Sequence, residues 1–174
     1  MTTVSDGERN IELVRGIHES LIAAGFEKFR LAAVNAKNWD DSIVRLPEAV
    51  RPLMQVIDPG IEIDTRHFPL PFGSEGHWVG REQWLQFWKT WLEPWDEFSY
   101  EVSNFDSAGD DVLMDLAITA RGHDSHVPVE WVLSQIWTVR DGRIVRMRPY
   151  GNREEALAAL QQARGSGSDP TDGE

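Results

Sequence analysis

Three polar residues of different chemical type could take part in chemistry. Asp64 ends a short segment that alternates apolar and polar residues, and His18 lies on the apolar stripe of an amphipathic segment. Gln135 shares a strand face with large apolar residues. A buried amide on that face costs free energy unless it is hydrogen-bonded, so its presence there indicates a structural or functional role. Carboxylate, imidazole and carboxamide groups can each exchange a proton or make strong hydrogen bonds, so each of the three is a candidate for chemistry.

Each of the three also has a simpler structural interpretation. A histidine on an apolar helical face is commonly a satisfied core residue, and a buried amide must find hydrogen-bond partners wherever it lies. Asp64 precedes Thr65 and Arg66, so it could be an exposed strand-end carboxylate or pair with Arg66. Orientation separates these interpretations, because a base must point into a cavity.

Aromatic residues are the other conspicuous feature, since the chain has eight Trp. From Trp84 to Trp95 they recur at three- and four-residue spacing, which predicts one face of a helix. Such a face packs in a core, and its middle can also line an apolar cavity. Arg146, Arg148 and Tyr150 share one face of the last predicted strand, which could reach an anionic ligand group. The residues expected to contact a ligand are Trp84, Trp88, Trp91, Trp131, Trp137, Arg148 and Tyr150.

Composition and missing motifs exclude several classes of function. The chain has 174 residues, no cysteine and a net charge of -12. Absence of cysteine removes disulfides and cysteine-bound zinc and fits a cytoplasmic location, while the negative charge disfavours nucleic acid. No apolar run is long enough to span a membrane, and the familiar nucleotide and hydrolase motifs are missing, so no cofactor is expected. His123 and His126 flank Asp124 without a third ligand nearby, so we expect no metal site.

The order of the predicted elements indicates an α+β fold in one domain, because helical patterns come first and an antiparallel meander follows. The predicted helices cover residues 9–24, 26–37, 47–57, 84–95 and 152–162. The predicted strands cover residues 61–65, 98–105, 112–121, 127–140 and 144–150. A turn is predicted over 38–41 and a loop over 67–80. The domain is expected over 9–163, after a loose N-terminus (1–8) and before a disordered tail (164–174).

An apolar patch is expected on the outer face of this sheet. Val132, Ile136 and Val112 or Met114 lie there among polar neighbours. Apolar patches of this kind are usually covered, and homodimers cover them most commonly. We therefore expect a homodimer.

Four segments of the sequence carry a family resemblance. They are NIELVRGIHES, DPGIEIDT, VGREQWLQFWKTWLEPWDEF and WTVRDGRIVRMRPYGNREEAL, and together they extend over about residues 9–160. They resemble the nuclear transport factor 2-like superfamily and, more narrowly, its SnoaL-like polyketide cyclase branch. The resemblance implies a conical α+β barrel, in which a bent antiparallel sheet surrounds helices and a deep apolar pocket. Members include isomerases, cyclases, hydrolases and proteins that only bind, so the fold alone does not give the function.

The ketosteroid isomerase pattern of this superfamily can be transferred to three positions. Its catalytic Asp closes a D-x-x-[IVT]-x-x-D spacing that ends here at Asp64. Its first-helix Tyr falls on His18, and its strand carboxylic acid falls on Gln135. An alternative register matches VNAKNWD to the family's helix end and places Arg30 at the Tyr position.

The resemblance implies a cofactor-independent acid/base enzyme, with Asp64 as the base and with His18 and Gln135 as donors. Its substrate would be an apolar ring compound with a carbonyl group, and the reaction an isomerisation, cyclisation or dehydration. The alternative is a non-catalytic module that binds a ligand or another protein and has kept only the fold.

Overall fold

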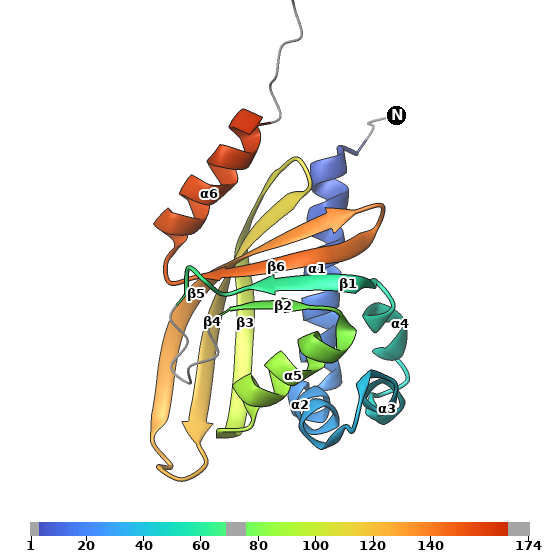
Figure 1. The fold of residues 1–174 in the computed structure, drawn as a ribbon. Coiled ribbons are helices and arrows are strands. Elements are labelled where there is room, and N and C mark those ends of the chain that lie inside the picture. Colours follow the sequence, from blue (N-terminus) through green and yellow to red (C-terminus); the bar gives the residue numbers. More distant parts are fainter. Residues whose placement is uncertain (1–3, 69–75, 167–174) are drawn as a thin grey trace, which may run out of the picture.

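A curved six-stranded sheet is the framework of the protein (Figure 1). The computed structural model describes residues 4–68 and 76–166. The strands lie in the order β2-β1-β6-β5-β4-β3, antiparallel except where β1 runs parallel to β6. Their bounds are Ile57–Asp64 (β1), His77–Val79 (β2), Trp95–Ala108 (β3), Asp111–Gly122 (β4), Pro128–Arg140 (β5) and Arg143–Tyr150 (β6). With the helices described next, this sheet confirms the predicted α+β class.

Helices α1, α2, α5 and α6 begin and end within four residues of their predicted positions, whereas α3 and α4 differ more. Their bounds are Asp6–Ala24 (α1), Phe26–Asn35 (α2), Trp39–Arg45 (α3), Arg51–Met54 (α4), Arg81–Leu92 (α5) and Arg153–Ser166 (α6). α1 begins before residue 9 because the Ser5 hydroxyl accepts from the Glu8 N–H while the Glu8 carboxylate accepts from the Ser5 N–H. Residues 6–8 belong to α1 and residues 164–166 to α6, so these parts of the predicted loose N-terminus and disordered tail are helical. The rest of the two predicted segments, 1–3 and 167–174, lies outside the described residues. No helix in the described ranges is long and apolar enough to cross a membrane.

Three other predicted segments differ from the structure. The predicted turn at 38–41 is the first turn of α3, because the Asn38 side chain accepts from the Asp41 N–H at 2.9 Å. The predicted helix over 47–57 contains only the single turn of α4, and Ile57 already belongs to β1. The predicted loop 67–80 contains β2, whereas 69–75 lies outside the described residues. Trp95 leaves the tryptophan helix and opens β3.

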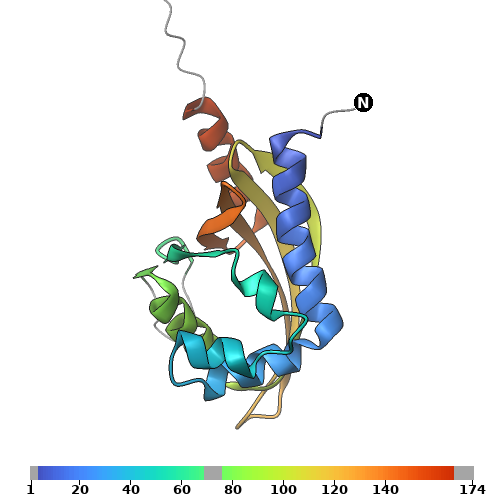
Figure 2. The same cartoon turned by 90° about the vertical axis from the view of Figure 1, so that its right-hand side faces the viewer.

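The two faces of the sheet pack against different helices. α1 crosses the inner face and contacts β3 and β4, and α5 packs against β1 beside α2 and α3. α6 packs against the outer face, where it contacts β3, β4, β5 and β6. Figures 1 and 2 show α1 running along the sheet and α6 lying apart from the other helices. The inner face therefore carries the main core, and the outer face carries a second, smaller one.

The second core covers the outer-face patch that was expected to form a dimer interface. Ile136 is fully buried there against Ala156 and Leu160 of α6. Val112 and Met114 face inward instead, because they pair with Trp137 and Gln135 of β5. The remaining patch residue, Val132, is 63% exposed. The expected patch is thus corrected, and the homodimer stays a prediction without this support.

Candidate functional site

The inner face of the sheet and helices α1, α2 and α5 enclose a cavity of about 50 Å³, which we call the main cavity. Its described lining is almost entirely apolar and aromatic, and its polar side chains are His18, Tyr100 and Gln135. Pockets that hold drug-sized ligands have volumes of roughly 300–1,000 Å³. The main cavity lies well below this range, so a small ring compound enters it only when lining side chains move.

His18 reaches the main cavity from α1, where it lies one turn after the fully buried Val14. Its Nδ1 atom lies 3.0 Å from the hydroxyl oxygen of Tyr100 on β3. Burial lowers the pKa of His18 to about 3, and burial also raises the pKa of Tyr100 above its ordinary value. Both side chains are consequently neutral at pH 7.

The hydrogen positions in this pair follow from its surroundings. Nε2 of His18 is buried and has no hydrogen-bond partner among the described residues. If Tyr100 donates to Nδ1, the imidazole hydrogen lies on Nε2 and a single N–H remains unpaired. The opposite arrangement would leave both the Tyr100 O–H and the Nε2 lone pair unpaired, at a higher cost. We therefore assign the hydrogen to Nε2, which makes His18 a buried N–H donor in a residue that lines the main cavity.

Gln135 provides the second donor. The indole N–H of Trp137 donates to Gln135 Oε1 at 3.0 Å. An indole nitrogen can only donate, so this contact fixes which end of the amide carries the oxygen. The amide nitrogen then has no partner in the part of the chain that the structure describes. The His18 ring packs edge-on against Trp137 with 5.1 Å between ring centres, so the two predicted donors lie beside the same indole.

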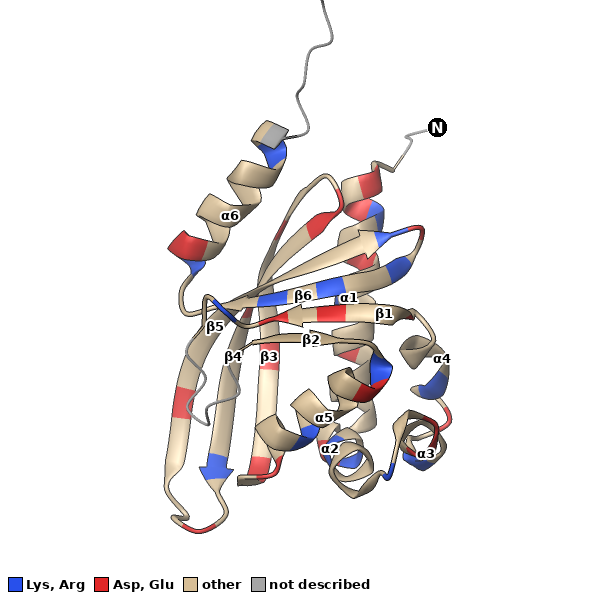
Figure 3. Cartoon of the chain, viewed as in Figure 1, with Lys and Arg blue, Asp and Glu red and all other residues tan. Residues whose placement is uncertain are grey.

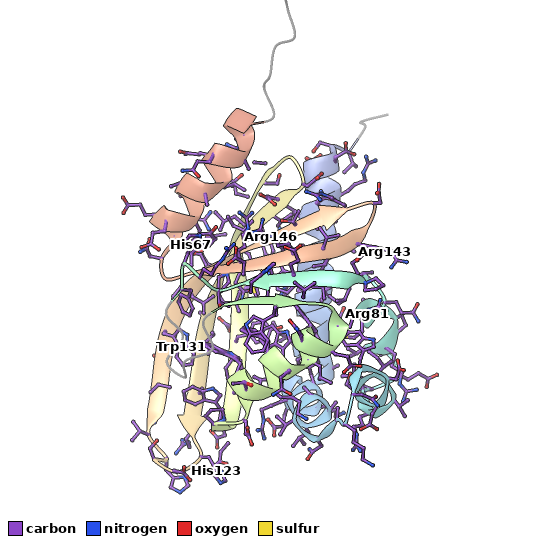
Figure 4. All side chains as sticks on the ribbon, viewed as in Figure 1. His67, Arg81, His123, Trp131, Arg143 and Arg146 are labelled. Atoms are coloured by element: carbon purple, nitrogen blue, oxygen red, sulfur yellow. The ribbon has the colours of Figure 1, made fainter. Side chains whose placement is uncertain are left out.

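Four of the five predicted tryptophans line the main cavity. Trp84, Trp88 and Trp91 come from α5 and Trp137 from β5. Trp131 does not line it, although it lies on the same strand face as Trp137. It packs instead against Trp91 and Trp95, with 6.3 and 5.5 Å between ring centres, nearer the β4–β5 hairpin (Figure 4). Its expected ligand contact is thus corrected.

Arg148 and Tyr150 lie on the outer face of the sheet, away from the main cavity. Their partners in the register are Ile136 and Ser134, which are outer-face residues of β5. Arg148 donates to the Asp111 carboxylate at 2.8 Å, and Tyr150 belongs to the second core under α6. The expectation that they contact a ligand in the pocket is corrected, because strand alternation turns them to the opposite side.

Asp64 also lies on the outer face, so the expectation that it points into the pocket is corrected. Its neighbour Ile63 pairs with Met147, which lines the cavity, and alternation turns Asp64 the other way. The carboxylate accepts two side-chain hydrogen bonds from Arg66, at 2.8 and 2.7 Å, and one from Arg146 at 3.0 Å. Figure 3 shows these acidic positions of β1 beside basic positions of β6, where Figure 4 labels Arg146.

These contacts determine the protonation of Asp64. The hydrogen bonds from the Arg66 side chain, with smaller contributions from its N–H and from Arg146, hold the pKa of Asp64 well below its usual range. The side chain is only 2% exposed, so it is neither a cavity base nor a solvent-facing carboxylate. Asp64 therefore has a structural role, joining β1 to β6 through Arg146.

The Asp64→Asn variant is expected to lower the free energy of unfolding by about 1–2 kcal/mol at pH 7, because charge-assisted hydrogen bonds are lost. Since the folded-state pKa is depressed, the contribution is present above about pH 4 and is lost as the pH falls below it. Urea unfolding of both chains at pH 7 and pH 3 measures this difference. Affinity for a cavity ligand should stay the same, and a large loss of affinity would contradict the outer-face placement.

The structure also separates the two registers proposed for the first-helix donor. Arg30 donates to Glu27 and to the Trp95 carbonyl, the latter at 2.8 Å, and it does not line the main cavity. His18 does line it.

Tyr100 was not predicted, although its position two residues after Phe98 in an alternating strand places it on the inward face. This alternation in the sequence was the signal that could have identified Tyr100 as an inward hydroxyl.

The chemistry open to this cavity follows from its polar groups. No carboxylate belongs to the described lining, and His18 is a weak base because of its low pKa. The side chains of His18 and Gln135 place N–H donors among apolar side chains, and the Trp88 indole N–H is a further unpaired donor in the described lining. These donors can bind one or two acceptor atoms of a ligand. The cavity is therefore suited to hold a neutral ring compound by an oxygen atom.

Comparisons with known proteins agree with this architecture. The model of the SnoaL-like domain family matches residues 27–147. A protein from Jannaschia described as a SnoaL-like polyketide cyclase is 17% identical, with a TM-score of 0.59 over 92% of this chain and 97% of its own. A nuclear transport factor 2-like protein of unknown function from Burkholderia pseudomallei is 12% identical, with a TM-score of 0.57 over 87% and 96%. The epoxide hydrolase/cyclase-like enzyme SalBIII is 14% identical, with a TM-score of 0.53 over 86% and 95%.

The family match extends over more than half of the chain. This protein therefore belongs to the SnoaL-like domain family and has the nuclear transport factor 2-like fold. At these identities the solved structures support the fold alone. A comparison with curated proteins finds no match.

Proposed function

We propose that this protein binds a small, neutral ring compound in the main cavity and holds its carbonyl oxygen with His18 and Gln135. One observation carries the proposal: the N–H donors of His18 and Gln135 have no partner among the described residues, and both residues lie beside the Trp137 indole in a largely apolar and aromatic lining. Unpaired buried donors are costly, so a ligand oxygen that accepts from them contributes binding free energy. The aromatic rings supply the apolar contact area.

Binding is favoured over carbon-acid catalysis by the absence of a base in the described lining. The carboxylate that the family pattern offered is engaged by Arg66 and Arg146. Imidazole with a pKa of about 3 is mostly deprotonated at pH 7 but accepts a proton weakly.

Catalysis remains a second candidate, because SnoaL-like and SalBIII-like neighbours are described as cyclases. In that case the same two donors would polarise a ligand carbonyl or hold its oxyanion. Turnover of a carbonyl-bearing ring substrate that disappears in Gln135→Met, with ligand affinity reduced much less, would favour it.

Titration with cyclohexanone tests the binding proposal. In ¹H–¹⁵N spectra the indole N–H signals of Trp84, Trp88 and Trp137 should shift and saturate, because these residues line the main cavity. Signals of Trp131 and Trp95 should stay in place, since neither lines it. Absence of saturable shifts, or shifts confined to Trp131 and Trp95, would contradict the proposal.

A further inference from the structure

A second, smaller cavity of about 20 Å³ lies next to the main cavity, and we call it the side cavity. Its far wall comes from α2 and α3, which belong to the segment between the first helix and the first strand. The two cavities share four lining residues: Phe29, Met54, Trp84 and Trp88. Only side chains therefore separate the two spaces.

The far wall is fixed to α5 by polar contacts. The Lys89 ammonium donates to the Ala36 carbonyl at 2.7 Å, and the Glu82 carboxylate accepts from the Trp39 N–H at 3.0 Å. Arg81 lies over the Trp39 ring, with 5.3 Å to its centre. α2 and α3 are thus anchored, and the side chains between the cavities are the part that can change.

Trp88 lies between the two cavities and, unlike Trp95 and Trp137, makes no indole hydrogen bond to a described residue. The indole N–H groups of Trp95 and Trp137 donate to the Trp91 carbonyl and to Gln135, each at 3.0 Å. The Trp88 N–H is buried and has no hydrogen-bond partner among the described residues. Ring contacts with Trp84 and Phe87, at 5.6 and 5.3 Å between centres, hold it by packing alone. No directional bond therefore fixes the Trp88 ring.

We propose that Trp88 is the specificity-determining residue that limits a ligand to the main cavity. Replacing it with a small side chain joins the two cavities into one elongated site for compounds with two rings. This inference rests on the proposed function for the nature of the ligand. Whether replacing Trp88 joins the two cavities can be tested separately from whether the unsubstituted chain binds cyclohexanone.

The experiment compares Trp88→Ala with the matched variant Trp131→Ala, which removes a partly buried tryptophan outside both cavities. The probe is 4-phenylcyclohexanone, a two-ring ketone, and calorimetry measures its affinity. Trp88→Ala should bind the probe at least 10-fold more tightly than the unsubstituted chain, and Trp131→Ala should stay within about threefold, since only the former enlarges the site. Equal affinities for the two variants would overturn the inference.

Two further measurements keep the result decisive. If circular dichroism shows that Trp88→Ala does not fold, Trp88→Phe replaces it, with an expected gain of about threefold from its smaller ring. No gain in a folded Trp88→Phe then overturns the inference. Cyclohexanone binding to the unsubstituted chain tests the proposed function on its own. A chain that fails to bind cyclohexanone, together with a Trp88→Ala variant that binds the two-ring probe, would refute the function and retain the role of Trp88.

Discussion

The double variant His18→Phe with Gln135→Met should lose about 10- to 100-fold in affinity for cyclohexanone. Each replacement keeps the approximate shape of the side chain and removes its N–H donor, together with the atom that accepts from Trp137 or Tyr100. A hydrogen bond in a protein contributes about 0.5–1.5 kcal/mol net, so two of them correspond to a loss of this size. Calorimetric titration of both chains measures it.

Methylenecyclohexane is the control ligand for this comparison, because its CH₂ group replaces the carbonyl oxygen and cannot accept a hydrogen bond. Its affinity should change by less than about threefold between the two chains, since no hydrogen bond is lost. Trp131→Phe, outside the cavity, should bind both ligands like the unsubstituted chain. Equal losses for the ketone and the hydrocarbon would mean that the substitutions acted on cavity shape, and would contradict the role of the donors.

Acid is expected to destabilise the protein through His18. The folded state holds its pKa at about 3, whereas an unfolded histidine titrates near 6.5. Below pH 6.5 the unfolded chain therefore binds a proton that the folded chain refuses, and the free energy of unfolding falls. Between pH 7.5 and pH 4.5 this group accounts for about 2–3 kcal/mol.

Urea unfolding of the unsubstituted chain and of His18→Phe at several pH values isolates this contribution. As the pH falls from 7.5 to 4.5, the unsubstituted chain should lose about 2–3 kcal/mol more free energy of unfolding than His18→Phe, because it alone carries the buried imidazole. Other titrating groups are common to both chains and cancel in the difference. Parallel curves would mean that His18 is not buried in its neutral form.

The sequence predicted the parts of the fold that rest on periodicity. The tryptophan helix and the four long strands follow directly from spacing, as did the inward orientation of His18 and Gln135. The N-terminal start of α1 was recoverable too, since Ser5 and Glu8 form a capping box three residues apart. Local rules therefore predicted the class of the fold and the inward orientation of two of the three candidate residues.

Asp64 could not be placed from the sequence alone. The family spacing predicts that Asp64 points into the pocket, whereas alternation along the strand turns it to the face opposite Ile63. Only the pairing of Ile63 with Met147 shows which of the two faces is the inner one. Arg146 is far away in the chain and becomes its partner only through the parallel pairing of β1 with β6. The covering of Ile136 by α6 is likewise a tertiary contact with no local signal.

A crystal structure of the protein with cyclohexanone would show whether His18 and Gln135 hold the ketone oxygen. The ring should lie between the aromatic side chains of the main cavity, with its oxygen about 2.7–3.2 Å from His18 Nε2 and from Gln135 Nε2. A ligand found outside this cavity, or inside it with its oxygen turned away from both nitrogens, would contradict the proposed binding mode.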